Sequence, residues 1–317
     1  MASASLNKVQ KAAVESFGKP ILIFAGAGSG KTRVLTHKIA HLIKDNLVQP
    51  QNILALTFTN KAANEMRVRV NKIIKNKSAL VAMGTFHSVC AKILRSEIQA
   101  LGYTSEFSIF DTQDQLSLIK VLLEPKDFPK NYMTPKDLRF RISNFKNKMI
   151  SPEEAKKKAN IILEKQYAEL YDEYQKALKK NNAVDFDDLL LLPLKIFDKN
   201  PKVLKKYQDS WKYILVDEYQ DTNKPQFMLV KRLAESHQQI CVVGDDDQSI
   251  YGWRGADINN ILDFEKDYPS VKTVRLEENY RSTGIIVAAS SSLIHKSLSR
   301  EQKQAISMHE QGDAITV

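Results

Sequence analysis

The chain has 317 residues, of which 43% are hydrophobic, and this is enough to bury the core of one large domain or two ordinary ones. No apolar run approaches about 18 residues, the N-terminus lacks the pattern of a signal peptide, and two cysteines are too few for a disulfide framework. These features exclude membrane-spanning and secreted classes and lead us to expect a cytoplasmic protein. The 47 Lys and Arg residues outnumber the 37 Asp and Glu residues, and this excess favours a polyanionic partner such as nucleic acid; a merely soluble basic protein is the alternative.

Short runs rich in β-forming residues alternate with helical stretches along most of the chain. The helical stretches include Thr32–Asn46 and Asn60–Lys75. Apolar strands that alternate with helices predict a parallel α/β sheet, in which ligands bind at the carboxyl ends of the strands. The predicted strands are Pro20–Ala25, Ile53–Thr59, Leu80–Gly84, Tyr213–Asp217, Ile240–Gly244 and Val271–Leu276.

The segment Ala25–Thr32 follows the first strand and has the pattern of a phosphate-binding loop. Its glycines allow backbone N–H groups to turn onto phosphate oxygens at the N-terminus of a helix, which favours anions. Lys31 would reach the β- and γ-phosphates, and the Thr32 hydroxyl would ligate Mg²⁺. Ala25 stands where the strict pattern has glycine, and a structural turn is the alternative interpretation.

The middle of the chain, residues 111–194, has a helical pattern nearly throughout. Ser151-Pro152-Glu153-Glu154 offers an N-cap, a proline at the first helical position and a glutamate that closes a capping box. Thr134-Pro135-Lys136-Asp137 repeats most of this pattern. We therefore predict a helical insertion between two parts of one α/β sheet. Its basic surface could contact duplex DNA, but a solvated helix face is the favoured interpretation.

Two carboxylates follow the apolar strand that begins at Tyr213. Asp217 would hold Mg²⁺, directly or through water, and Glu218 would orient and deprotonate the water that attacks the γ-phosphate. A solvated acidic strand end is the alternative. The presence of a phosphate-binding loop upstream makes the catalytic interpretation the stronger one.

Four polar residues, Asp245–Gln248, follow the strand Ile240–Gly244. A side chain at this edge of the sheet could sense whether the γ-phosphate is present. The three aspartates could instead suggest a metal site. We do not expect one, because three consecutive carboxylates on an extended backbone cannot all face one ion.

Exposed aromatic residues provide platforms on which any DNA base can stack, at about 1–3 kcal/mol per base. Tyr251 and Trp253 lie close together after a strand, beside Arg254. Phe58 and Phe86 each stand at a strand end with hydroxyl neighbours and repeat the arrangement, although both could also belong to the core. His87 could contact DNA or be a buried hydrogen-bonding histidine.

Seven motifs follow one another in order along almost the whole chain. They resemble the Q motif and motifs I, Ia, Ib, II, III and IV of the UvrD/Rep/PcrA group of superfamily-one DNA helicases. One such match would be weak evidence, but seven in sequence are specific. The matching segments are Leu6-Asn7 with Gln10, Gly26–Thr32, Thr57–Ala63, Gly84–His87, Asp217–Thr222, Val243–Ala256 and Glu278–Thr283.

The resemblance implies a RecA-like P-loop ATPase that uses ATP and Mg²⁺. Gln10 and Arg33 would contact the adenine base, and Tyr280 would stack on it. Thr32 and Asp217 would hold the metal ion. The nucleotide-binding residues would be Gln10, Ala27, Gly28, Ser29, Gly30, Lys31, Thr32, Arg33, Tyr280 and Arg281.

The resemblance also implies catalytic and DNA-binding roles. Glu218 and Lys31 would be catalytic, Gln248 would couple the γ-phosphate to the DNA site, and Arg281 would serve as an arginine finger. The DNA-binding residues would be Phe58, Asn60, Thr85, His87, Tyr251, Trp253 and Arg254.

By the same resemblance, residues 1–110 and 195–283 would form the two parts of RecA-like domain 1A. Residues 111–194 would form the helical subdomain 1B, with Val184–Leu190 as its exit, and residues 284–317 would begin domain 2A. Members of the group translocate 3′→5′ along single-stranded DNA and act at junctions between single and double strands.

Members of the group continue through a second RecA-like lobe that carries motifs V and VI, so the resemblance implies a C-terminal half, domains 2A and 2B, as a partner. Gly312–Val317 reads as the first strand of that lobe, without a sheet to join. Because stepping needs two lobes that close on ATP, we expect this chain to bind nucleotide and DNA weakly, to hydrolyse ATP slowly and not to unwind alone.

The leading function is therefore the motor half of an ATP-dependent 3′→5′ DNA helicase in repair or replication. The motor part of a helicase–nuclease complex is one alternative, and a nucleotide-switched module that binds single-stranded DNA without unwinding is another. A P-loop kinase for a small molecule would leave Tyr251–Arg254 unexplained.

Overall fold

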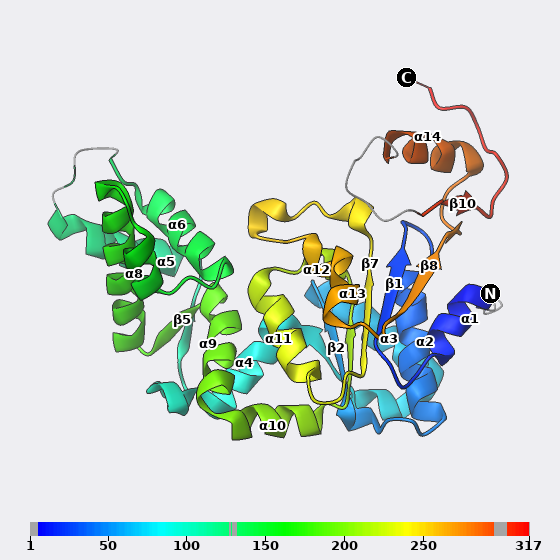
Figure 1. Ribbon diagram of the computed structural model, residues 1–317, viewed down its shortest axis with the longest axis horizontal. Helices are drawn as coiled ribbons and strands as arrows, with labels where there is room; N and C mark the ends of the chain where they lie inside the picture. The colour runs from blue at the N-terminus through cyan, green and yellow to red at the C-terminus, as the bar shows by residue number, and fades with distance from the viewer. Residues whose placement is uncertain (1–5, 127, 129–131, 295–302, 317) are drawn as a thin grey trace. The chain divides into compact units, whose positions relative to one another are not determined.

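Six parallel strands form the central sheet of the computed structural model, which describes residues 6–126, 128, 132–294 and 303–316 (Figure 1). Their spatial order is β3-β2-β6-β7-β1-β8, so strands that are neighbours in the sheet are often distant in the sequence. The predicted parallel α/β sheet is confirmed, and each predicted run overlaps one strand. The strands are β1 (Ile21–Ala25), β2 (Ile53–Thr57), β3 (Ala82–Thr85), β6 (Tyr213–Val216), β7 (Ile240–Gly244) and β8 (Lys272–Leu276).

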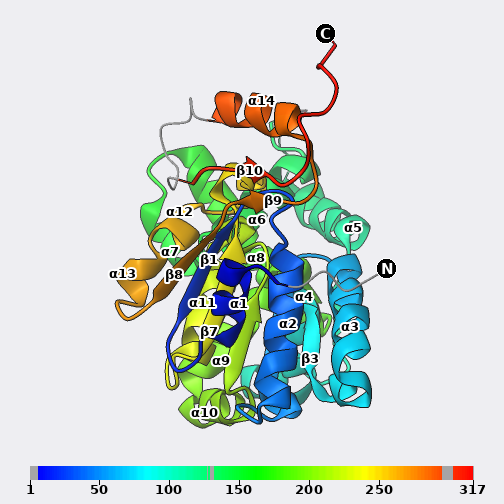
Figure 2. The ribbon, with the colours of Figure 1, turned by 90° about the vertical axis from the view of Figure 1, so that its right-hand side faces the viewer.

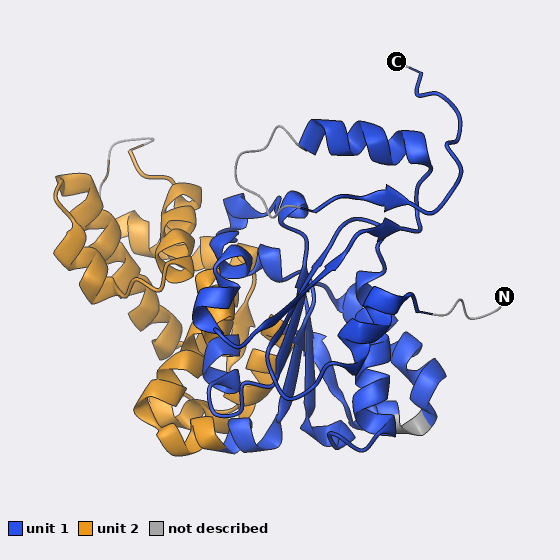
Figure 3. Cartoon of the chain, turned by 45° about the vertical axis from the view of Figure 1, so that its right-hand side comes forward, with its two compact units in different colours: residues 1–85, 206–222, 230–317 blue, residues 86–205, 223–229 orange. Residues whose placement is uncertain are grey.

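The chain divides into two compact units, which Figure 3 distinguishes by colour. The first unit holds the sheet and comprises residues 1–85, 206–222 and 230–317. The second comprises residues 86–205 and 223–229 and is largely helical. No helix in the described part of the chain has both the length and the apolar character needed to cross a membrane.

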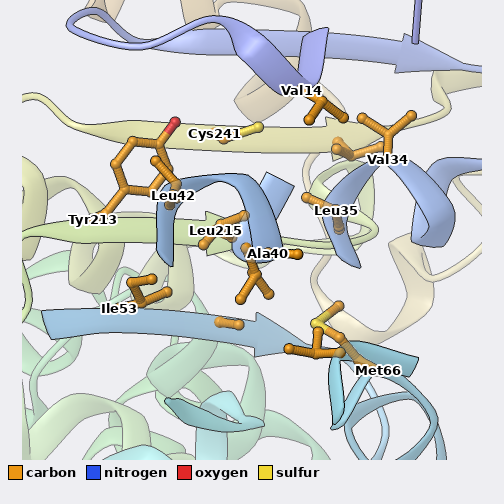
Figure 4. Packing of buried hydrophobic residues seen from close by; sticks show 14 of the residues in the cluster. Val14, Val34, Leu35, Ala40, Leu42, Ile53, Met66, Tyr213, Leu215 and Cys241 are labelled. Carbon is orange, nitrogen blue, oxygen red and sulfur yellow. The ribbon is translucent and has the colours of Figure 1, made fainter. Parts of the chain in front are cut away.

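Three helices of the first unit cover one face of the sheet (Figure 1 and Figure 2). Alternate strand residues, among them Leu215 and Cys241, face this side because successive side chains of a strand point to opposite faces. They pack with Val14, Leu35 and Met66, one from each helix (Figure 4). The helices are α1 (Lys8–Glu15), α2 (Lys31–Lys44) and α3 (Asn60–Ile74).

A buried lysine fixes α1 against α2. The ammonium of Lys38, on α2, donates hydrogen bonds to the carbonyls of Ala13, Val14 and Ser16 over 3.1, 3.2 and 2.5 Å. These carbonyls lie at the C-terminal end of α1, where backbone acceptors have no partner within the helix. The lysine therefore caps α1 and sets the position of that helix beside the sheet.

Helices dominate the second unit, as predicted for residues 111–194. Thr134 and Ser151 form the predicted capping boxes. The sequence did not predict the short parallel pair of β4 (Ser108–Phe110) and β5 (Ala183–Asp185). The helices are α4 (Phe86–Glu97), α5 (Thr112–Leu123), α6 (Pro135–Asn147), α7 (Pro152–Lys158), α8 (Ile162–Lys180) and α9 (Phe186–Lys199).

A buried charge network lies inside this helical unit. Lys146 is 0% exposed, and its ammonium lies 2.6 Å from Asp185 and 2.9 Å from Asp188. The Tyr174 hydroxyl donates a further hydrogen bond of 3.0 Å to Asp185. Burial, followed by the charge of Asp185, raises the pKa of the neighbouring Asp187 to about 6. The network thus holds several carboxylates around one ammonium.

The last part of the chain forms a second parallel strand pair, β9 with β10. The predicted strand Gly312–Val317 is wrong over the described residues 312–316, which hold no strand; Val317 lies outside the described residues. The strand forms earlier, at β10, because the Ile306 N–H donates to the Glu277 carbonyl just before β9 and the Met308 N–H donates to the Asn279 carbonyl of β9. The remaining elements are α10 (Pro201–Ser210), α11 (Lys224–Ala234), α12 (Asn259–Leu262), α13 (Phe264–Asp267), β9 (Glu278–Asn279), α14 (Gly284–Ile294) and β10 (Ile306–Ser307).

Candidate functional site

The loop between β1 and α2 makes turns that suit glycine. Gly28 and Gly30 have φ values of 74° and 90°, in the left-handed region. A Cβ at Gly30 would lie 2.9 Å from Gln10 Nε2, so the loop also needs glycine for close packing. The Ser29 hydroxyl donates to the Gly26 carbonyl over 2.7 Å. The predicted phosphate-binding loop therefore ends at the N-terminus of α2, where backbone N–H groups favour an anion.

A cavity of about 430 Å³ opens beside this loop. It gathers most of the residues predicted for nucleotide binding and catalysis, from four separate parts of the chain. Gln10, Ser29 and Asp217 were also predicted but are not among the lining residues. The lining residues are Gly26, Ala27, Gly28, Gly30, Lys31, Thr32, Arg33, Arg69, Glu218, Gln248, Tyr280 and Arg281.

Two of the side chains predicted for catalysis, Lys31 and Glu218, lie together in the cavity. The Lys31 ammonium lies 3.2 Å from Glu218 Oε2 and has no hydrogen-bond partner within the described part of the chain. The Glu218 backbone has φ 50° and ψ 47°, a left-handed conformation that costs a non-glycine residue roughly 1–3 kcal/mol. The Lys31 ammonium, beside a strained glutamate, therefore has N–H groups that can donate hydrogen bonds to phosphate oxygens.

Asp217 directly precedes Glu218 in the sequence, immediately after the end of β6, and is buried. Its Oδ1 accepts a hydrogen bond of 3.1 Å from the Glu218 N–H. Burial, followed by the negative charge of Glu218, raises the pKa of Asp217 to about 7, while Lys31 opposes the rise. A cation would relieve this repulsion. The Asp217 carboxylate and the Thr32 hydroxyl supply the oxygen ligands that Mg²⁺ prefers, so the donor set fits that ion.

Gln10 supports the phosphate-binding loop from α1. Its side chain is 1% exposed, and its Nε2 donates a hydrogen bond of 2.9 Å to the Ser29 carbonyl. Its Oε1 accepts a hydrogen bond of 3.2 Å from the Asn7 N–H, within a capping box of α1. The structure thus places Gln10 against the loop, while Arg33 and Tyr280, the other residues predicted around the adenine, line the cavity.

Asn279, on β9, holds the loop from the opposite end of the chain, and the sequence analysis missed it. Its Nδ2 donates to the Ala27 carbonyl over 2.7 Å, and the Tyr280 N–H donates to the Gly28 carbonyl over 3.0 Å. Its Oδ1 accepts hydrogen bonds of 2.9 Å from the N–H groups of Arg281 and Ser282. These bonds bring Tyr280 and Arg281 to the cavity. The signal that could have identified Asn279 was its position inside the motif Glu278–Thr283.

Arg69, on α3, lines the cavity, and the sequence analysis missed it as well. It forms an ion pair with Glu65, one helical turn earlier. Arg69 lies beyond the motif that ends at Ala63, and no pattern distinguishes it from the other basic residues of the helix. Its guanidinium adds positive charge to the wall of the cavity.

The three aspartates after β7 converge, contrary to the sequence-based expectation. The carboxylate oxygens of Asp245, Asp246 and Asp247 lie within 4.8 Å of one another. The expectation was wrong because the backbone is not extended here: Asp246–Gln248 forms a turn of 3-10 helix. The ammonium of Lys303 lies 2.5 Å from Asp245 and 3.2 Å from Asp247, and it also contacts Asp246. A cation from the same chain therefore faces all three carboxylates.

The predicted aromatic platform is present as a row of rings in the first unit. The rings of Phe58 and Tyr251 are stacked with centroids 5.2 Å apart, and the centroids of Tyr251 and Trp253 lie 6.4 Å apart. The Arg254 guanidinium lies 4.6 Å from the centre of the Trp253 ring. Trp253 is 71% exposed. An exposed ring next to a cation offers both stacking and charge to a single strand.

The other predicted DNA contacts have mixed environments. Asn60 is exposed at the start of α3, and Thr85 is largely buried at the end of β3. Phe86 is buried, which confirms its core interpretation. In the second unit, His87 packs edge-on against Phe186, and burial lowers its pKa. A neutral histidine of this kind favours the hydrogen-bonding interpretation over an ionic DNA contact.

Comparison with known proteins agrees with this geometry. Residues 6–269 match the family model described as "UvrD/REP helicase N-terminal domain". The ATP-dependent DNA helicase PcrA of Bacillus subtilis is 49% identical over 313 residues, which cover 99% of this chain and 42% of the relative. The proteins of the same name from Staphylococcus epidermidis and Staphylococcus aureus are each 47% identical, over 98% of this chain and 43% and 42% of the relatives. The chain spans less than half the length of these curated relatives. Because the family model covers most of its residues, the chain belongs to the UvrD/REP helicase N-terminal domain family.

Proposed function

We propose that this chain is the ATP-hydrolysing and strand-gripping part of an ATP-dependent 3′→5′ DNA helicase. The observation that carries the proposal is the pair Lys31 and Glu218, which face each other at 3.2 Å in the loop cavity. The exposed Trp253 in the same unit supports the DNA part. The relatives are named ATP-dependent DNA helicases. This chain matches 42% of the length of the Bacillus subtilis PcrA, so the activity of the whole helicase is proposed for it.

ATP hydrolysis begins, in this proposal, with an exchange of partners at Lys31. The γ-phosphate would take the ammonium from Glu218, since phosphate oxygens carry more charge than one carboxylate. Glu218 would then be free to orient the attacking water and accept its proton. Arg281 and Arg69 line the same cavity and would stabilise charge on the phosphoryl oxygens. Mg²⁺, held by Thr32 and Asp217, would supply further charge neutralisation there.

The nucleotide would be held by the residues around the loop. Arg33 and Tyr280 line the cavity and would contact the adenine base. Gln10 would aid nucleotide binding in two ways: it would contact the adenine base, and its hydrogen bond to the Ser29 carbonyl would hold the loop in place. Gln248 lines the same cavity and would report the γ-phosphate to the DNA-binding residues that follow it.

Single-stranded DNA would bind across the aromatic row. Bases would stack on Trp253 and Tyr251, while Arg254 would attract the phosphates. Phe58, Asn60, Thr85 and His87 remain proposed contacts of the same strand, as their motifs imply. The 3′→5′ direction, the action at single-strand to duplex junctions and a role in repair or replication rest on the family resemblance.

The proposed domain division follows the same resemblance. Residues 1–110 and 195–283 would make domain 1A, residues 111–194 subdomain 1B, and residues 284–317 the start of domain 2A. The thiols of Cys90 and Cys241 are free and buried, which suits the cytoplasm that we propose as the location.

The test is steady-state ATP hydrolysis by the purified chain, with and without single-stranded DNA. Lys31→Ala serves as the blank, and Lys11→Ala, on the exposed side of α1, serves as the matched lysine control. We expect turnover that DNA stimulates and that only Lys31→Ala abolishes. Nucleotide and DNA binding without any turnover would favour a nucleotide-switched binding module instead. Failure to bind nucleotide would overturn the proposal.

A further inference from the structure

Lys303 lies in an unusual place for a lysine that no motif includes. Its side chain is 7% exposed, while those of Asp245, Asp246 and Asp247 are 3%, 0% and 14% exposed. Ion pairs so far from solvent are little screened by salt and are well defined in geometry. A lysine in the C-terminal part of the chain therefore takes part in the structure of the loop after β7.

The Asp245 carboxylate connects this lysine to the cavity. Its Oδ1 lies 2.5 Å from the Lys303 ammonium, and its Oδ2 accepts a hydrogen bond from the side-chain amide of Gln248. The two oxygens of one rigid carboxylate are thus held from opposite sides. Gln248 lines the nucleotide cavity, so the orientation of its amide depends on a carboxylate that Lys303 holds.

The backbone around Lys303 is attached to the strand that supports the phosphate-binding loop. The N–H of Gln304 donates to the Glu277 carboxylate over 3.0 Å, and the N–H of Ile306 donates to the Glu277 carbonyl over 2.8 Å. Two residues after Glu277, Asn279 donates to the Ala27 carbonyl in the loop. A continuous set of contacts therefore runs from the loop through β9 and β10 to Lys303, and from there to Gln248.

We propose that Lys303 is a positioning residue for Gln248. Acting through Asp245, it fixes the Gln248 amide at the nucleotide cavity and links that amide to the position of β9 and of the loop. Such a link would let a shift of the loop on nucleotide binding reach Gln248 and the aromatic row that follows it. This inference rests on the proposed DNA-stimulated ATP hydrolysis, and the experiment separates the two.

The test compares Lys303→Met, which removes the charge and keeps the stem, with Lys303→Arg, which restores the charge. We expect Lys303→Met to lower the DNA-stimulated kcat roughly twofold to thirtyfold, with the nucleotide Kd within about twofold of the unmodified chain. Lys303→Arg should recover most of the loss. Lys272→Met is the matched control, because Lys272 also makes a partly buried contact, 2.6 Å to the Ser16 hydroxyl, away from the cavity. Lys303→Gln replaces the Met variant if that variant does not fold.

Two further results decide whether the effect passes through Gln248. The double variant Lys303→Met with Gln248→Ala should lose no more kcat than Gln248→Ala alone, and a larger loss would overturn the inference. The side-chain amide signal of Gln248 in ¹⁵N NMR should move in Lys303→Met and stay in place in Lys272→Met. If the Gln248 signal does not move in Lys303→Met, the inference is overturned whether or not the chain hydrolyses ATP. If the signal moves but the unmodified chain shows no turnover, only the proposed function is overturned.

Discussion

The Gln10 side-chain amide donates a 2.9 Å hydrogen bond to the Ser29 carbonyl, and this bond joins α1 to the phosphate-binding loop. The carbonyl belongs to a buried residue, and the closest approach of a Cβ at Gly30 would be to the same amide nitrogen, at 2.9 Å. The first helix of the chain is therefore a structural part of the nucleotide site, although Gln10 does not line the cavity.

Gln10→Ala should weaken nucleotide binding. The substitution leaves the Ser29 carbonyl buried without its donor, which costs roughly 1–3 kcal/mol and loosens the loop. We expect the Kd of a fluorescent ATP analogue to rise about fivefold to a hundredfold. Val9→Ala, at an exposed position of the same helix, is the control. An unchanged Kd in Gln10→Ala would show that the loop holds its form without α1.

Glu218→Gln should separate hydrolysis from binding. The amide cannot accept the proton of the attacking water, so kcat should fall about 100-fold or more. The Lys31 ammonium loses its ionic partner at 3.2 Å and becomes more available to phosphate, so nucleotide affinity should hold or improve. Paired measurements of kcat and of the Kd for ATP check this. Turnover within about threefold of the unmodified chain would exclude Glu218 as the base.

The fluorescence of Trp253 should change when DNA binds, and its ring should contribute to DNA affinity. The sequence has two tryptophans, so Trp211→Phe leaves Trp253 as the single indole fluorophore. Its emission should be quenched when single-stranded DNA stacks on the ring. Trp253→Ala should weaken DNA binding by about 1–3 kcal/mol, or roughly fivefold to 150-fold, without changing nucleotide affinity. Fluorescence titration of Trp211→Phe and anisotropy with labelled DNA give the two measurements, and equal DNA affinity in both variants would contradict the stacking role.

Asp187 gives the helical unit a dependence on pH. Its pKa is raised to about 6 in the fold, so between about pH 4 and pH 6 the folded chain binds more protons at this site than the unfolded chain. The contribution of Asp187 to stability is therefore present at the low end of this window and is lost as the pH rises, by at most about 3 kcal/mol.

Asp187→Asn should remove this contribution, because the amide does not titrate. The check is the free energy of unfolding by urea at pH 4.5 and pH 6.5 for both proteins. The stability of the variant relative to the unmodified chain should increase with pH. The opposite trend would mean that the Asp187 carboxylate is stabilised as an anion, by Lys146 for example.

The sheet and the nucleotide cavity were predictable because two signals occur together in the sequence: an apolar run that predicts a strand, and a functional residue that follows it. Each strand is an apolar run, and each functional residue follows one at its carboxyl end, as Lys31, Glu218 and Gln248 do. In a parallel sheet the carboxyl ends meet at one edge, so local pattern and function coincide. The resemblance then added residues such as Tyr280 and Arg281, which no local pattern would have assigned to ATP.

The contacts that were missed depend on pairings between distant segments. Lys303 meets Asp245 across 58 positions of sequence, and Asn279 meets Ala27 across 252. Neither lysine nor asparagine has a distinctive pattern in its own neighbourhood. The convergence of the three aspartates was missed for a different reason, since the turn that begins at Asp246 breaks the extended backbone that the argument assumed.

The position of β1 in the sheet has a consequence for how the protein is made. Ile21 pairs with Cys241 on one side and Lys272 on the other, so both neighbours of β1 follow it only after a long stretch of sequence. At about 5–20 residues per second, a ribosome leaves this apolar strand without either neighbour for roughly 10–50 seconds. The phosphate-binding loop, which follows β1 directly, is thus synthesised well before the strands β7 and β8 that flank β1. Until β7 and β8 emerge, the nascent chain presents an unpaired hydrophobic strand to chaperones and to other nascent chains.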